Sequence, residues 1–271
     1  MLLASWNIVI MRQKWLLIAD PRRTVLPREQ HFLMAIDTST IDYREGNTVL
    51  EGYLAFDPFS SPKPTVLIAH AWEGRDDFVS EKAHRLAALG YNSFALDVYG
   101  KGVLGNSPEV NAALMQPLLD DRGLLLRRLQ AGYDAACSSQ YVDRNRIAII
   151  GYCFGGLCAL DLARSGAALR GAVSFHGLLF PPENVETQPI DSKIMILHGD
   201  KDPLVPVEQV VACQRELSAA GADWQLHTFG NAMHSFTNPR AADTERGLVY
   251  NADADRRSWQ LLQWFLNDVF A

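Results

Sequence analysis

The stretch Ile149-Ile150-Gly151-Tyr152-Cys153-Phe154-Gly155-Gly156 predicts a buried strand that runs into a helix through a sharp turn centred on Cys153. Gly151 and Gly155 flank the cysteine because such a turn leaves no room for side chains there. The turn lifts the central side chain above the sheet and points the N-terminus of the helix towards it. The helix dipole at that end favours a thiolate. Cys153 is therefore a candidate nucleophile, and the alternative is a small buried residue at a tight corner.

Outward from this turn, segments with strand character alternate with segments of helical spacing. The expected strands cover residues 47–57, 64–71, 92–100, 146–153, 171–177, 193–200 and 224–230. The expected helices cover residues 76–90, 108–138 with an interruption near Pro117, 154–166, 205–221 and 253–270. This alternation predicts an α/β fold in one domain, with a mostly parallel sheet covered by helices on both faces.

Composition narrows the functional class. The chain has 271 residues, of which 48% are hydrophobic, and a net charge of -6, so it can bury one large core. There is no basic patch for a nucleic acid and no apolar run long enough to span a membrane, so neither partner is expected.

Residues 34–271 are the predicted domain. Residues 1–33 are expected to be an N-terminal extension, either disordered or created by a start codon placed too far upstream, with a mitochondrial transit peptide as the alternative.

The four cysteines are Cys137, Cys153, Cys158 and Cys213. Their spacing matches neither a zinc site nor a CxxC redox pair, so no metal is expected. A chain of this length has little need of disulfides, which favours reduced thiols and a cytoplasmic location.

A nucleophile at such a turn needs a histidine base and an acid that orients it, and the chain order in this architecture is nucleophile, acid, histidine. Asp202, in "LHGDKDPLVP", and His234, in "GNAMHSF", each follow a separate predicted strand. Asp200 is the rival acid, but it follows "HG" directly and is expected to cap a turn. The rival histidines are His84 in a helix, His227 within a strand, His176 and His198 at strand ends, His70 beside a loop, and His31 outside the domain.

Acyl transfer also needs donors for the developing oxyanion. The backbone N–H of Phe154, which follows the nucleophile, is one candidate. The backbone N–H of Trp72, in the "AWEG" loop after an early strand, is the other, placed by topology and analogy.

The motifs "LIAHAWEG", "FALDVYG", "IGYCFGG", "HGDKDPLVP" and "AMHSF" together resemble the dienelactone hydrolase family, over almost the whole chain from Met34. The resemblance implies an α/β-hydrolase fold and a Cys-Asp-His triad formed by Cys153, Asp202 and His234. It also implies ester or lactone hydrolysis without a metal or organic cofactor. The oxyanion donors would map to Phe154 and Trp72.

Two departures from the family pattern concern the pocket. The family has a thiol-activating glutamate at the position of Ala71, and Glu73 lies two residues later. The family also has arginines that hold a substrate carboxylate; one of these positions is Asn238 here, with Arg240 nearby. The second arginine is missing as well, because none occurs between residues 85 and 122. The expected pocket residues are Ala71, Glu73, Tyr99, Phe236 and Asn238.

The function predicted first is a cysteine-dependent hydrolase of small carboxylic esters or lactones that works through a thioester intermediate. One alternative is a thioesterase or cysteine peptidase with the same triad, and another is a hydrolase-like protein that binds a ligand with little turnover. The expected partner is a small-molecule substrate, and the chain is expected to be a monomer or a homodimer.

Overall fold

The structure is a computed structural model that describes residues 36–183 and 185–271. The expected extension, residues 1–33, lies outside the described residues. Eight strands form one sheet: β1 (Asp37–Glu45), β2 (Thr48–Phe56), β3 (Lys63–Ala69), β4 (Asn92–Leu96), β5 (Val142–Tyr152), β6 (Gly171–Phe175), β7 (Lys193–Gly199) and β8 (Trp224–Phe229).

The strand order in the sheet is β1-β2-β4-β3-β5-β6-β7-β8. The strands from β4 to β8 pair in parallel, whereas β2 is antiparallel to both β1 and β4. The central strands β3 and β5 end side by side, with Ala69 opposite Gly151. The carboxyl end of the sheet, where ligands bind in open α/β folds, therefore lies next to Cys153.

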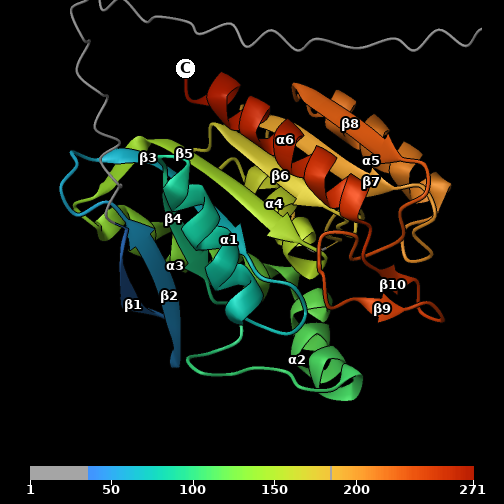
Figure 1. The fold of residues 1–271 in the computed structure, drawn as a ribbon, viewed down its shortest axis with the longest axis horizontal. Coiled ribbons are helices and arrows are strands. Elements are labelled where there is room, and N and C mark those ends of the chain that lie inside the picture. Colours follow the sequence, from blue (N-terminus) through green and yellow to red (C-terminus); the bar gives the residue numbers. More distant parts are fainter. Residues whose placement is uncertain (1–35, 184) are drawn as a thin grey trace, which may run out of the picture. The chain divides into compact units, whose positions relative to one another are not determined.

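Helices cover both faces of the sheet (Figure 1). Helices α1 (Asp77–Ala88) and α6 (Ala252–Val269) pack on one face, and α3 (Arg122–Ser138), α4 (Phe154–Arg164) and α5 (Val207–Ala219) pack on the other. Side chains of β3 alternate between the two cores: Val66 and Ile68 face α1, and Leu67 and Ala69 face α4. This period of two follows from strand geometry. The predicted fold class, a mostly parallel sheet between two helical layers, is confirmed.

The interruption of the long helical region was expected near Pro117, and that position is wrong. Helix α2 (Pro108–Asp120) continues through Pro117. The break comes at Asp121, where the side chain accepts a hydrogen bond from the N–H of Leu124 and so caps α3. The capping carboxylate, rather than the proline, sets the boundary.

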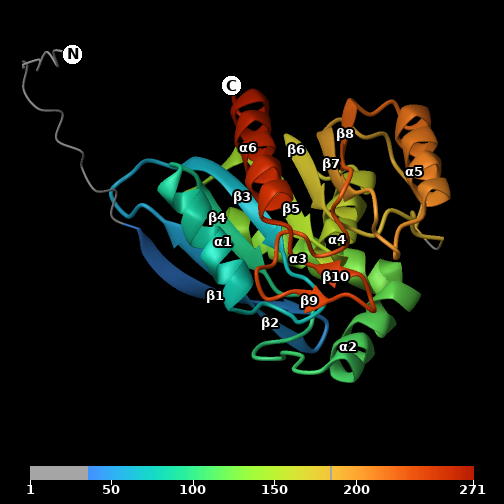
Figure 2. The ribbon, with the colours of Figure 1, turned by 45° about the vertical axis from the view of Figure 1, so that its right-hand side comes forward.

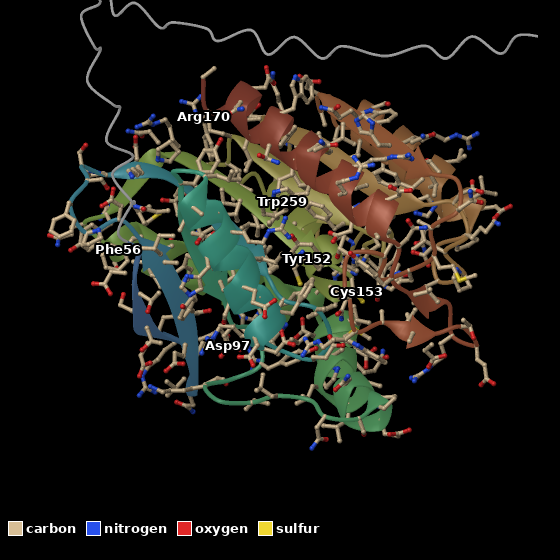
Figure 3. The ribbon with its side chains drawn as sticks, in the orientation of Figure 1. Phe56, Asp97, Tyr152, Cys153, Arg170 and Trp259 are labelled. Atoms are coloured by element: carbon tan, nitrogen blue, oxygen red, sulfur yellow. The ribbon has the colours of Figure 1, made fainter. Side chains whose placement is uncertain are left out.

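Two short strands that the sequence pattern did not predict, β9 (Ala242–Asp243) and β10 (Leu248–Val249), form a separate hairpin. Figure 2 shows this hairpin and α2 at the same end of the sheet. Figure 3 shows Cys153 at this end too, whereas Arg170, which precedes β6, lies at the opposite end. Within residues 36–183 and 185–271, every helix is too short or too polar to span a lipid bilayer.

Candidate active site

Cys153 sits in a strained turn between β5 and α4, with φ 55° and ψ -116°. A Cβ atom on Gly151 would lie 1.8 Å from the carbonyl oxygen of Gly155, and one on Gly155 would lie 2.1 Å from the carbonyl oxygen of Ala69. Both positions therefore require glycine. Among the described residues, the only others with a positive φ that are not glycine are His176 and Ser235, and strain of this kind gathers at functional sites.

The backbone N–H groups around the turn differ in their partners. The N–H of Cys153 donates to the carbonyl oxygen of Phe175 at 3.0 Å and to Nδ1 of His176 at 3.2 Å. Within the described part of the chain, the N–H groups of Phe154 and Trp72 donate no hydrogen bond. Two unpaired donors are thus available, one directly after Cys153 and one in a loop that lines the same cavity.

Asp202 and His234 are brought together although 32 residues separate them. Nδ1 of His234 and Oδ2 of Asp202 lie 2.7 Å apart, and both side chains are buried. Because a carboxylate accepts, Nδ1 carries the proton and Nε2 is left to face the site. Nε2 is buried. Asp200, the rival acid, is exposed.

The electrostatic surroundings of His234 favour its charged form. Burial lowers its pKa, but the negative charge of a Cys153 thiolate, hydrogen bonds to Asp202 and Cys153 and the charge of Asp202 together outweigh burial and raise the pKa to about 10. His234 can therefore take and hold a proton beside a negatively charged sulfur.

The other three cysteines lie in less reactive surroundings. None of the four forms a disulfide. Burial raises the pKa of Cys158 well above its usual value, raises that of Cys213 to about 11, and also raises that of Cys137. None of these three lines the cavity that contains Cys153. A nucleophilic role therefore suits Cys153 alone.

A cavity of about 640 Å³ opens beside Cys153. Besides the turn at Cys153, its walls come from the loop at Trp72, helix α2, the loop after β6, the loop after β7, and the segment around the β9–β10 hairpin. Most of the lining is apolar, with Ala112, Met115, Leu178, Leu204 and Leu248 among its members. A second cavity of about 420 Å³ shares Trp72, Ser235 and Leu248 with the first.

The expected pocket residues occupy different places. Glu73 and Asn238 line the second cavity, not the one with Cys153. Oε1 of Glu73 accepts a hydrogen bond from the Trp72 indole at 2.8 Å, and burial raises the pKa of this carboxyl group. Ala71, Tyr99 and Phe236 line neither cavity. Tyr99 instead donates to the carbonyl oxygen of Trp72 at 3.1 Å.

Phe236 is fully buried, and its ring packs edge-on against His176 at 5.0 Å between ring centroids. It therefore supports the site from the core rather than offering an aromatic surface to a ligand.

Arg246 lines the Cys153 cavity and was missed by the sequence reasoning. It lies in the turn between β9 and β10. Because the sequence pattern did not predict these two short strands, nothing in the sequence indicated the position of Arg246 in the cavity. Its Nε donates to Oδ2 of Asp243 at 2.6 Å. Arg240 lines the second cavity and donates to Oδ2 of Asp76 at 2.8 Å. Each arginine thus already has a carboxylate partner.

The described residues hold no group of three or more His, Cys, Asp or Glu side chains that could bind a metal ion. The arrangement of a half-buried cysteine, a histidine oriented by a carboxylate and two unpaired N–H groups can support acyl transfer.

Comparison with known proteins gives a consistent result. The profile of the dienelactone hydrolase family matches residues 50–270. An uncharacterised protein of Caenorhabditis elegans is 39% identical over 155 residues, which is 56% of this chain and 98% of that protein. An Aquifex aeolicus protein that carries the name "Putative carboxymethylenebutenolidase" is 25% identical, over 82% of this chain and 94% of its own.

A solved structure described as a dienelactone hydrolase-like promiscuous phosphotriesterase from metagenomic libraries is 36% identical and superposes with a TM-score of 0.83, covering 88% of this chain and 100% of its own. The sheet topology is accordingly that of an α/β hydrolase. The chain therefore belongs to the dienelactone hydrolase family and is a hydrolase of ester or lactone bonds.

Proposed function

We propose that the protein hydrolyses small, uncharged carboxylic esters or lactones by covalent catalysis, with Cys153 as nucleophile, His234 as general base and acid, and Asp202 as the group that orients His234. The observation that carries the proposal is that the buried His234 is held through Nδ1 by Asp202 and interacts with Cys153 strongly enough to raise its own pKa. A histidine held in this way can accept and keep the proton of the neighbouring thiol.

In the first half-reaction, the thiol proton is already held on Nε2 of His234, as the raised pKa of that histidine implies, and the thiolate of Cys153 attacks the carbonyl carbon. The carbonyl oxygen becomes an oxyanion, which the N–H groups of Phe154 and Trp72 stabilise. The tetrahedral intermediate collapses, the bond to the leaving oxygen breaks, and His234 gives its proton to the departing alcohol. The acyl group remains on Cys153 as a thioester.

In the second half-reaction, His234 takes a proton from water, and the resulting hydroxide attacks the thioester carbon. The same N–H donors stabilise the second oxyanion. When the carbon–sulfur bond breaks, the acid is released and the proton returns to the sulfur or stays on His234. Together, the two half-reactions convert the ester and one water molecule into the acid and the alcohol.

The preference for uncharged substrates rests on the charges around the cavity. Arg246 is paired with Asp243, and the cavity also contains Glu109 and Glu245. An incoming carboxylate would have to compete for a guanidinium that already has a partner, and it would meet two like charges. Apolar walls favour a small acyl or alcohol portion without charge.

The covalent step is tested with an activated aryl acetate and mass spectrometry of the rapidly quenched enzyme. We expect a burst of phenol and one acetyl group on the peptide that contains Cys153, neither of which appears in Cys153→Ala. Cys158→Ala is the matched control, because that thiol is buried outside the cavity, and it should keep both signals. Turnover by Cys153→Ala at the wild-type rate would overturn the proposal.

The substrate class is tested by comparing a carboxylated lactone with its methyl ester in wild type, Arg246→Ala and Arg240→Ala. We expect kcat/KM to favour the methyl ester in all three. A preference for the free acid that disappears in one of the variants would identify that arginine as a carboxylate contact.

The free thiols also fit a reducing compartment, so the proposed location is the cytoplasm.

A further inference from the structure

His176 contacts the backbone of Cys153 and the ring of His234, but it does not line the Cys153 cavity. It follows β6 with a φ of 39°, and its side chain is buried. Its Nδ1 accepts the backbone N–H of Cys153 at 3.2 Å. Its Nε2 lies 2.8 Å from Oγ1 of Thr237, a buried residue in the loop that begins at His234.

The two contacts determine the tautomer of His176. A backbone N–H can only donate, so Nδ1 must be unprotonated and Nε2 must carry the single proton. Nε2 therefore donates to the hydroxyl oxygen of Thr237. Burial, reinforced by the positive charge of His234, holds the pKa of His176 well below its usual value, so the neutral ring persists.

The ring of His176 also packs against the ring of His234. Their centroids are 5.3 Å apart in an edge-to-face arrangement, and His234 itself is held on the far side by a hydrogen bond from the N–H of Val249 to its carbonyl oxygen. The loop that carries His234 is held at several points, and the contact through Thr237 ties it to the residue that accepts the backbone N–H of Cys153.

We propose that His176 is a positioning residue: its neutral imidazole joins the backbone of the Cys153 turn to the His234 loop through Thr237 and so sets the distance between the nucleophile and its base. The inference rests on the proposed function of Cys153 and His234. Proton transfer between them needs hydrogen-bond reach, so a small relative shift of the two segments lowers the rate without altering the substrate cavity.

The test separates the two contacts of His176 by substitution. His176→Asn can keep an acceptor near Nδ1 while losing the bond to Thr237. Thr237→Val removes the same bond from the other side with little change in shape, and Thr237→Ser keeps the hydroxyl as the matched control. Rates are normalised to the Cys153 thiol that an activated aryl acetate acylates, because a misfolded chain would expose the other three cysteines to a general alkylating reagent.

We expect kcat per titrated thiol to fall about tenfold in His176→Asn and in Thr237→Val, as expected for one lost hydrogen bond, with KM unchanged. Thr237→Ser should keep the wild-type kcat. The double variant should be no slower than either single variant, because both remove one link. If His176→Asn does not fold, the two Thr237 variants carry the test.

Wild-type kcat in Thr237→Val, a loss of melting temperature without a loss of kcat, or additive losses in the double variant would each overturn the proposal. These results differ from a failure of the proposed function itself. That failure would appear as turnover in Cys153→Ala, whatever the Thr237 variants do.

Discussion

Replacing Gly155 by alanine tests whether the Cys153 turn depends on close contact between α4 and β3. The added Cβ would lie 2.1 Å from the carbonyl oxygen of Ala69, whereas such contacts are essentially never shorter than 3.0 Å. The contacted oxygen belongs to the backbone of Ala69, and the added Cβ is fixed to the backbone of residue 155. Neither atom can rotate away, so the turn must move by roughly 0.9 Å. Overpacking of this kind costs up to about 3 kcal/mol, and the better helix propensity of alanine returns about 1 kcal/mol.

The net loss of about 2 kcal/mol should lower the melting temperature by about 4–8 °C in a domain of this size. A displacement near 1 Å at the nucleophile should also reduce kcat/KM by about a hundredfold. Calorimetry and an aryl acetate assay measure the two effects. Gly230→Ala is the matched control, since no atom lies within 4 Å of its added Cβ, and it should change neither quantity. Wild-type activity and melting temperature in Gly155→Ala would refute the reasoning.

Three further predictions follow from the site and the chain organisation. Asp202→Asn should remain folded and lose about a thousandfold or more in kcat, because the amide no longer selects the Nδ1-protonated tautomer of His234; steady-state kinetics with circular dichroism measures this. In Cys153→Ala, the pKa of His234 should fall below about 10, because burial remains while the charge and the hydrogen bond of Cys153, both of which raise it, are removed; NMR titration should find no such change in Cys158→Ala. A chain that begins at Met34 should melt within about 4 °C of the full chain, equivalent to about 1 kcal/mol, and hydrolyse esters equally well; insolubility would contradict this.

The alternation of elements and the turn at Cys153 could be predicted from the sequence because their causes are local. Short apolar runs such as 147–150 are typical of strands buried between helical layers, and glycines at 151 and 155 leave room for the turn. The candidate residues Asp202 and His234 could be identified from the sequence for a related reason. Parallel strands bring their carboxyl ends to one edge of the sheet, so residues just past strand ends meet there.

Tertiary structure alone decided how the pocket is lined and how the site is held. Arg246 enters the cavity because the β9–β10 segment folds over the sheet end near α2, and two-residue strands leave no periodic pattern in a sequence. Phe236 points into the core rather than the pocket, since a loop has no fixed side-chain alternation from which to read a direction. The link from His176 to Thr237 joins residues 61 positions apart. The sequence shows that each can form hydrogen bonds, but only packing of the strand ends against the His234 loop makes them partners.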